Sequence, residues 1–250
     1  MRAIILAAGR GQRLKQPQDR QIPKCLLRFG GRSLLERHLR LLAQLGVEQV
    51  VLALGYRSDL IEAELARLDL RRRPQIVLNP AFELGSVLTV HTAAAALLGG
   101  GEVLLMDADV LYHARVLRAL VAGEQPANRL LMDRDFEAGE EPVKICLRAG
   151  VPVELRKRLD PQLSYDAIGE SVGFFRFDER GARRLAQLVA GYVERGASDM
   201  PHEEAIRDLI REGSQSFEIA DVTGAPWIEI DFPADVLRAE REVLPELEPL

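Results

Sequence analysis

The 250-residue chain has little cysteine and no excess of positive charge. Its two cysteines, Cys25 and Cys146, are too few for a disulfide framework, and neither lies in a CxxC or Cys/His pattern typical of zinc sites. The 33 Lys and Arg residues are outnumbered by 38 Asp and Glu residues, which gives a formal net charge of −5. Because general binders of nucleic acid or of anionic membrane surfaces normally carry a basic excess, we expect neither partner.

Long hydrophobic runs are also missing. The apolar segment 3–8 is shorter than a signal-peptide core and is followed at once by Arg10 and Arg13. No segment approaches the roughly 20 apolar residues that a membrane-spanning helix needs. Together with the scarce cysteines, these absences predict a soluble protein of the reducing cytoplasm.

Short apolar segments alternate with amphipathic segments in the first half of the chain. Strands are expected at 3–6, 50–54, 75–78, 103–106 and 130–132. Helices are expected at 33–45, 58–68, 86–98 and 114–121. Ser33 followed by Glu36 is a capping box at the start of the first helix, and Gly46 ends it. Strands that are apolar throughout and alternate with helices indicate an α/β fold with a doubly wound, mostly parallel, Rossmann-like sheet.

The alternation changes in the second half. A hairpin is expected from 142–147 and 151–155, with its turn at Ala149-Gly150. The remaining expected elements are strands at 171–177, 217–220 and 227–230, helices at 180–193 and 203–211, and a last helix that begins at Pro233. The chain length is compatible with one domain. We therefore predict a single domain over the whole chain, 1–250, with a small inserted β region at about 134–178 and 215–231.

A glycine-rich loop follows the first expected strand. In a doubly wound sheet ligands bind beyond the carboxyl ends of the strands, where Leu6-Ala7-Ala8-Gly9-Arg10-Gly11-Gln12-Arg13 lies. Small residues let backbone N–H groups approach phosphate oxygens, and Arg13 adds a bidentate donor. The dinucleotide fingerprint GxGxxG is incomplete because Leu14 stands at its third glycine, and no GxxxxGK[ST] motif is present. A Rossmann-type oxidoreductase is therefore disfavoured, and an ordinary strand-to-helix loop is the remaining alternative.

The same loop, followed ten residues after Leu14 by Lys24 in Pro23-Lys-Cys-Leu-Leu, resembles the signature of a nucleotidyltransferase family. Its members join a nucleoside triphosphate to a phosphorylated sugar or alcohol and release pyrophosphate. The resemblance implies that Arg13 holds the triphosphate and that Lys24 bridges the α-phosphate and the incoming phosphate, so both are expected catalytic residues. It also implies these nucleotide-binding residues: Leu6, Ala7, Ala8, Gly9, Gly11, Asn79, Gly85, Ser86 and Asp107. For Gly85-Ser86, donation to a pyrimidine edge and capping of a helix are both open.

Two aspartates are expected to hold a metal ion. Asp107 and Asp109 follow the fourth expected strand, with their side chains on the same side because direction alternates along a strand. A hard cation such as Mg²⁺ takes one or two carboxylates together with phosphate oxygens and water. The resemblance implies that Asp109 and the late Asp231 are the metal ligands and that Mg²⁺ is the cofactor. Glu229 and Asp235 are expected to have supporting roles, and a simple helix N-cap is the alternative for Asp231.

The second half of the chain supplies most residues expected to bind the acceptor. Lys157, in Glu154-Leu-Arg-Lys, resembles the family's lysine for the acceptor phosphate. The other expected acceptor-binding residues are Tyr112, Asp133, Glu170 and Gly173. As a hypothesis, the acidic run 133–141 selects a cationic acceptor, whereas a solvated charge run is the alternative. Candidates for a cation–π face toward such an acceptor are Tyr112, Phe136 and Trp227.

Among small members of the family, the chain most resembles cytidylyltransferases, through Gly85-Ser86 and the ending Pro226-Trp-Ile-Glu-Ile-Asp. The resemblance implies CTP and a small acceptor such as phosphocholine, 2-aminoethylphosphonate or inositol phosphate as substrates. A sugar-1-phosphate uridylyl- or thymidylyltransferase is the nearest alternative. A non-catalytic nucleotide-binding regulatory subunit is the second, although the expected catalytic and metal-binding residues are all present. A homodimer is a further hypothesis, and the polar insert 15–22 departs from the family pattern and is expected to alter closure of the glycine loop.

Overall fold

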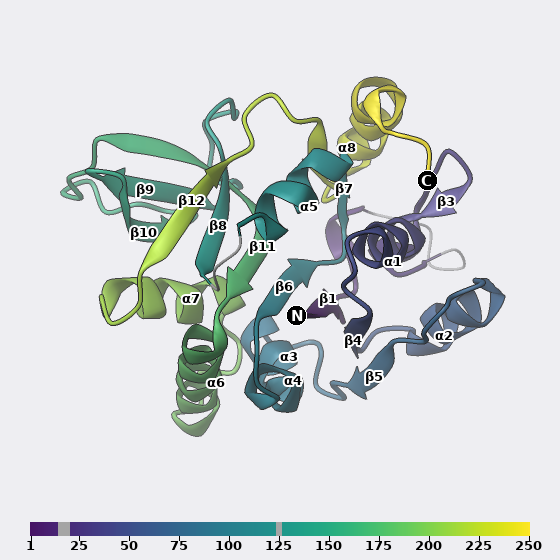
Figure 1. Cartoon of the computed structure of the whole chain (residues 1–250), viewed down its shortest axis with the longest axis horizontal. Coiled ribbons are helices and arrows are strands. Elements are labelled where there is room, and N and C mark those ends of the chain that lie inside the picture. The colour runs from purple at the N-terminus through teal and green to yellow at the C-terminus, as the bar shows by residue number, and fades with distance from the viewer. Residues whose placement is uncertain (15–20, 124–126) are drawn as a thin grey trace.

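Residues 1–14, 21–123 and 127–250 are described by the computed structural model of the chain (Figure 1). A mixed sheet runs through the middle of the molecule, and helices cover both of its faces. This is the predicted α/β architecture with a mostly parallel central sheet. The insert 15–22, with its predicted effect on loop closure, lies outside the described residues except for Gln21 and Ile22.

Four parallel strands form one side of the sheet: β1 (Arg2–Ala7), β4 (Gln49–Leu54), β5 (Gln75–Leu78) and β6 (Val103–Asp107). Their order is β6-β1-β4-β5, and Ile4 of β1 lies level with Val51 and Leu105. Successive side chains of a strand point to opposite faces, and Ile4 and its neighbour Ile5 are both fully buried. Burial on both sides is the reason that β1, β4 and β6 are largely apolar, whereas β5, at the edge of the sheet, is only partly buried.

Helices pack on the two faces in separate groups (Figure 1). The face that carries Ile5 is covered by α1 (Leu34–Gln44), α2 (Ser58–Arg67) and α5 (Ala114–Val121). The face that carries Ile4 is covered by α3 (Ser86–Thr92), α4 (Ala94–Leu98), α6 (Glu179–Glu194) and α7 (His202–Arg211). The predicted cap of α1 is present, because the Ser33 hydroxyl accepts the Glu36 N–H at 3.1 Å. The segment expected as one helix at 86–98 is divided at Ala93 into α3 and α4.

Antiparallel strands extend the sheet beyond β6: β8 (Asn128–Asp133), β9 (Lys144–Arg148), β10 (Val151–Arg156) and β11 (Ala167–Phe177). The long β11 pairs with β6, β8 and β9, while β12 (Phe217–Asp221) pairs parallel to β8. The β9–β10 hairpin turns at Ala149 and Gly150 as predicted, and both residues have positive φ. The main path of the sheet is therefore β10-β9-β11-β6-β1-β4-β5. The domain boundaries and the extent of the inserted region stay predictions.

A small two-stranded sheet lies outside this path and was not expected at 110–112. It pairs β7 (Val110–Tyr112) antiparallel with β13 (Trp227–Glu229). The N–H of Ile230 also donates to the Asp109 carbonyl at 2.9 Å. This pairing brings the carboxyl end of β6 against a segment more than a hundred residues later. The remaining elements are β2 (Arg28–Phe29), β3 (Arg32–Ser33), α8 (Pro233–Arg238), a π-helical turn (Ala239–Val243) and 3-10 turns at Gln12–Leu14, Lys24–Leu26 and Leu244–Glu246.

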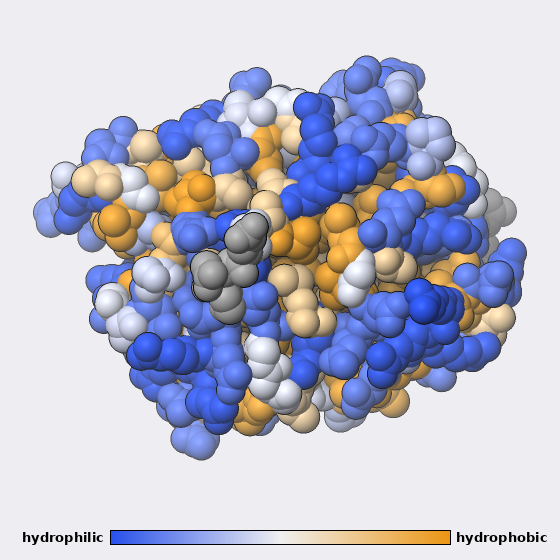
Figure 2. Space-filling model, viewed as in Figure 1, coloured by the Kyte–Doolittle hydropathy of each residue, from blue (hydrophilic) through white to orange (hydrophobic). Residues whose placement is uncertain are grey.

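The surface is mixed in polarity. On the face shown in Figure 2, hydrophilic residues surround smaller groups of hydrophobic ones. Among the described residues, none of the helices has both the length and the apolar character to cross a membrane.

Candidate active site

The glycine-rich loop lines a cavity of about 640 Å³ at the carboxyl end of β1, here called the loop cavity. The predicted residues on its walls are Leu6, Ala7, Gly9, Gly11, Arg13, Lys24 and Asp109. Gly11 has φ +61°, and a Cβ at this position would lie 2.8 Å from Cγ of Lys24. A glycine is therefore required here both by backbone conformation and by the close approach of Lys24.

Three carboxylates meet beside this cavity. Oxygens of Asp109, Glu229 and Asp231 lie within 4.8 Å of one another. The β7–β13 pairing produces this cluster, because Asp109 directly precedes β7 and Glu229 ends β13. The two predicted metal ligands are thus brought together, and Glu229 joins them from a position where only a supporting role was expected.

Two cations bind the carboxylate cluster. The Lys24 Nζ lies 2.7 Å from Asp109 Oδ2 and 2.5 Å from Asp231 Oδ1. Arg13 Nη2 donates to the same Asp231 oxygen at 2.8 Å. The glycine loop and the two predicted metal ligands therefore face each other.

The pKa shifts in the cluster reflect its crowded charges. Burial would lower the pKa of Lys24, but Asp109 and Asp231 outweigh it and raise that pKa above its usual range, so Lys24 stays charged. Burial, followed by the charges of Asp109 and Asp231, raises the pKa of Glu229 to about 8. Although solvent reaches part of Glu229, which lies on a cavity wall, the protein atoms around its carboxyl make burial the largest cause of this shift. Three oxygen donors crowded in this way fit a hard divalent ion such as Mg²⁺.

A second cavity of about 340 Å³, here called the inner cavity, continues from the cluster toward α3 and α7. The predicted residues on its walls are Ala8, Ser86, Asp107, Lys157 and Gly173, together with several that also line the loop cavity. Gly173 has φ +79°, and a Cβ there would lie 2.5 Å from Asp107 Oδ2. Gly173 therefore lets β11 pass close to Asp107. Burial, and then the charge of Glu203, raises the pKa of Asp107 well above its usual range.

Two residues predicted to read the base are committed to protein contacts. Asn79 is only 2% exposed, and its amide donates to Thr89 and accepts from the Ala81 N–H, both at 3.0 Å. The Gly85 N–H donates to the Ser198 carbonyl at 2.9 Å. The prediction for Asn79 is corrected accordingly, because its buried amide holds the segment before α3. Base contact by Gly85 stays a prediction.

Ser86 lies on the inner cavity but also binds the start of α7. Its hydroxyl accepts the His202 N–H at 2.8 Å and lies 3.0 Å from His202 Nδ1. The start of α3 has no side-chain cap, so Ser86 instead joins the starts of α3 and α7, and donation to a pyrimidine edge stays a prediction.

The prediction that Tyr112 contacts the acceptor is wrong. Tyr112 is 4% exposed, its hydroxyl pairs with His38 Nδ1 at 3.1 Å, and its ring packs edge-on against Phe174. As a residue of β7, Tyr112 faces the core under α1. The large apolar ring of Tyr112 suits this buried position in the core.

The buried His38 makes the free energy of unfolding depend on pH. Burial lowers the pKa of His38 to about 4, whereas the usual value is 6.5. Between these values the unfolded chain binds a proton that the folded protein does not, so stability is complete above about pH 6.5 and falls as the pH drops toward 4. At pH 5 this one group lowers the free energy of unfolding by about 2 kcal/mol.

His38→Phe should remove that contribution. Urea unfolding of wild type and variant at pH 7 and pH 5 measures it. The stability difference between the two proteins is expected to shrink by about 2 kcal/mol at the lower pH. A difference independent of pH would contradict the assigned cause.

Asp133 and Glu170 line a third cavity of about 540 Å³, the acidic cavity, which also contains Phe136 and Trp227. Asp133 accepts the Trp227 indole N–H at 2.7 Å with one oxygen and the Asp135 N–H at 2.9 Å with the other. Asp133 thus holds Trp227 in place, and acceptor binding by Asp133 stays a prediction. Burial, and then the charge of Asp133, raises the pKa of Glu170 to about 7.

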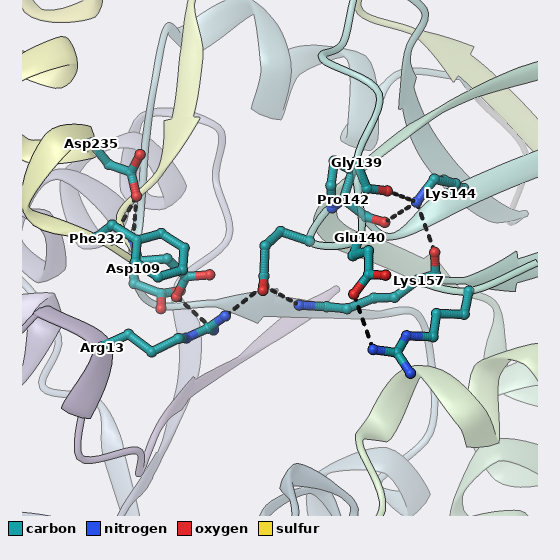
Figure 3. Close-up of polar contacts among 12 residues, drawn as sticks. Arg13, Asp109, Gly139, Glu140, Pro142, Lys144, Lys157, Phe232 and Asp235 are labelled. Atoms are coloured by element: carbon teal, nitrogen blue, oxygen red, sulfur yellow. Dashed lines mark hydrogen bonds and ion pairs between the residues drawn. The ribbon is translucent and has the colours of Figure 1, made fainter.

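Glu141, which has no separate role in the predictions, joins Arg13 and Lys157. One Glu141 oxygen lies 2.7 Å from Arg13 Nη1 and 3.2 Å from Lys157 Nζ. The segment around it is anchored by Lys144, whose ammonium donates to the carbonyls of Gly139, Pro142 and Lys157, as Figure 3 shows. No motif distinguishes Glu141 from the other acids of the run 133–141.

Comparisons with known proteins agree with this architecture. The chain is 26% identical to the CMP-5'-(3-aminopropyl)phosphonate synthase of Streptomyces rubellomurinus, over 99% of this chain and 40% of that protein. It is 30% identical to the bifunctional IPC transferase and DIPP synthase of Rubrobacter xylanophilus, over 97% of this chain and 52% of that protein. The chain thus spans about half the length, or less, of these curated relatives.

A solved structure of similar shape is the inositol-1-phosphate CTP transferase of T. maritima. It superposes with a TM-score of 0.74 at 23% identity, over 99% of this chain and 98% of the other. This likeness confirms the predicted fold class. The MobA-like NTP transferase domain matches residues 3–171, about two thirds of the chain. The chain therefore belongs to the family defined by the MobA-like NTP transferase domain.

Proposed function

We propose that the protein transfers the cytidylyl group of CTP to a small phosphonate or phosphate acceptor and releases pyrophosphate. The observation that carries the proposal is the convergence of Asp109 and Asp231 on Lys24, opposite the glycine loop. The names of the relatives, a CMP-phosphonate synthase and an IPC transferase, favour CTP and an acceptor of this class.

The reaction exchanges one P–O bond for another. An ionised oxygen of the acceptor attacks the α-phosphorus, the bond from that phosphorus to the bridging oxygen breaks, and pyrophosphate leaves with the electron pair. No general base is needed because the attacking oxygen already carries the charge. Catalysis of such a step consists mainly of positioning and charge neutralisation.

Different residues of this chain position the two substrates and neutralise their charge. Backbone N–H groups of the glycine loop and the Arg13 guanidinium bind the triphosphate, while Lys24 donates to the α-phosphate. Lys157, across the inner cavity, binds the acceptor's phosphonate or phosphate group. A Mg²⁺ ion held by Asp109 and Asp231, with Glu229 beside them, would neutralise developing charge on the phosphate oxygens.

A pyrophosphate-release screen tests the proposal. CTP, UTP, dTTP, ATP and GTP are each combined with aminoalkylphosphonates, phosphocholine, inositol phosphate and hexose-1-phosphates. Release is expected with CTP and a small phosphonate or alcohol phosphate, to stop with chelator and to return with Mg²⁺. Release with UTP or dTTP and a hexose-1-phosphate would support the sugar-phosphate alternative, and no release from any pair would contradict a catalytic role.

Glu141→Gln is expected to lower KM for CTP by about two- to fivefold. Glu141 is bound to both Arg13 and Lys157, so substrate phosphates must displace its carboxylate. The gain is modest because the pair is largely exposed, and exposed ion pairs contribute only ~0.2–1 kcal/mol. Steady-state kinetics checks this, with Glu140→Gln as the control because Glu140 pairs with the exposed Arg158. A raised KM in Glu141→Gln would show that Glu141 assists binding.

A further inference from the structure

A cavity of about 440 Å³, here called the basic cavity, lies at the amino ends of the parallel strands, opposite to the glycine loop. Arg2, Gln49 and Gln75 begin β1, β4 and β5, and all three line it. Arg2 lies level with Gln49 in the sheet, and Gln75 lies level with Val51. Since every second residue of a strand points to the same side, these four side chains share one face. That face is covered by α4, whose Ala96 is also part of the cavity wall.

The charge in the basic cavity has one sign. Within the described part of the chain, its ionisable lining groups are Arg2, Arg72 and Arg73, and no acid is among them. The adjacent Arg71 is paired with Glu48 at 3.2 Å. Arg72 and Arg73 have neither a carboxylate within 4.0 Å nor a hydrogen-bond partner in residues 1–14, 21–123 and 127–250. Guanidinium groups that share one cavity repel one another, so an anion bound among them would be stabilising.

Arg2 is the fixed member of the three. Its Nη1 donates to the Ala96 carbonyl at 2.8 Å, and its Nη2 donates to the Gly99 carbonyl at 2.9 Å. These bonds orient the guanidinium and offset the partial negative charge of the last carbonyls of α4. A guanidinium has five N–H donors, so others stay available for a ligand. The basic cavity therefore combines one oriented guanidinium with the two unpaired ones of Arg72 and Arg73.

The lining residues define the class of ligand. Guanidinium groups bind phosphate oxygens in a bidentate manner, and the side-chain amides of Gln49 and Gln75 can add N–H donors. One phosphate group carries a charge of about −2 at most, which is less than three guanidinium groups can neutralise. Two linked phosphates match the cavity better. The walls formed by Val50, Val51 and Pro74 are apolar and suit an organic remainder of such a ligand.

We propose that the basic cavity is a second binding site, which takes the diphosphate group of a small molecule. Arg2, Arg72 and Arg73 bind the phosphate oxygens, and any organic part lies against Val50 and Pro74. None of these residues lines the loop cavity or the inner cavity. The proposal is therefore independent of the proposed function, and failure of the pyrophosphate-release screen would leave it standing.

Chemical modification of arginine tests the site residue by residue. Wild type is treated with phenylglyoxal with and without inorganic pyrophosphate, in the absence of Mg²⁺, and peptide mass spectrometry follows each arginine. Saturating pyrophosphate should slow the modification of Arg72 and Arg73 by about tenfold, because occupied sites do not react. Arg241, which is also exposed and unpaired within the described residues, is the control and should react at an unchanged rate. NaCl at equal ionic strength should protect neither Arg72 nor Arg73.

Calorimetry then measures the affinity. The double variant Arg72→Gln/Arg73→Gln should weaken pyrophosphate binding at this site by about tenfold or more, since hydrogen bonds between charged groups are lost. Arg241→Gln is the matched control and should bind as wild type does. Arg72→Lys/Arg73→Lys keeps the charge and should retain part of the affinity. CDP replaces pyrophosphate in a second titration: tighter binding of CDP assigns an organic diphosphate, and equal binding assigns the phosphates alone.

Each of four results would overturn the inference. Modification of Arg72 and Arg73 could be unaffected by pyrophosphate, or Arg241 could be protected equally. Protection by NaCl alone would show only charge screening of solvated arginines. The fourth is a double variant that binds pyrophosphate as tightly as wild type, which would place all of the binding elsewhere in the protein.

Discussion

Asp109→Ala is expected to lower kcat by about a thousandfold. Asp109 supplies one of the three clustered carboxylates and one of the two anionic partners of Lys24. A bound metal ion contributes several kcal/mol of transition-state stabilisation, and each ~1.4 kcal/mol changes a rate tenfold. Loss of the ligand therefore removes most of the charge neutralisation that the proposed reaction needs. The measurement is kcat with saturating CTP and acceptor over a range of Mg²⁺ concentrations.

The fold is expected to survive this change. Lys24 keeps Asp231 as a partner, so no buried cation is left without a counter-charge. Thermal melting monitors the fold, and Asp59→Asn, on the exposed start of α2, controls for loss of an unrelated acid. A variant with kcat within threefold of wild type and an unchanged Mg²⁺ requirement would show that Asp109 is not a metal ligand.

The elements that the sequence predicts best are those with local signals. The strands β1, β4 and β6 are largely apolar because helices cover both faces, and Ser33 carries its own capping signal. The strand β7 has no such signal, since three residues directly after Asp109 show no periodicity. Yet β7 determines the geometry of the candidate site, because its pairing with β13 places Asp231 next to Asp109. Two strands that pair across more than a hundred residues cannot be recognised from the sequence of either short segment, because the whole fold determines their pairing.

The errors in the candidate site have the same origin. Asn79 and Tyr112 are residue types suited to ligand contacts, but tertiary partners engage them: Thr89 for the first and His38 for the second. Glu203 shows the converse. It stands at the start of a helix, where acids are favoured by the helix dipole alone. Only the fold shows that Glu203 faces a cavity while Glu204 is paired with arginines.

Lys24→Ala is expected to lower kcat by about a hundred- to a thousandfold. Lys24 is largely buried, and its ammonium is shared by Asp109 and Asp231 at 2.7 and 2.5 Å. Removal of one preorganised donor to developing negative charge costs about this much in other enzymes. Lys24→Arg should not restore the rate, because a planar guanidinium cannot place a compact ammonium charge between Asp109 and Asp231.

Lys24→Ala should also make the melting temperature depend on Mg²⁺. Without Lys24, the cluster of Asp109, Glu229 and Asp231 loses its closest cation, so the metal-free variant is expected to melt at a lower temperature than wild type. Mg²⁺ should then raise the melting temperature of the variant more than that of wild type, because it replaces the missing positive charge. Arg72→Ala, at an exposed position, is the control. Equal Mg²⁺-induced shifts in wild type and Lys24→Ala would mean that the ammonium and the metal do not share these carboxylates.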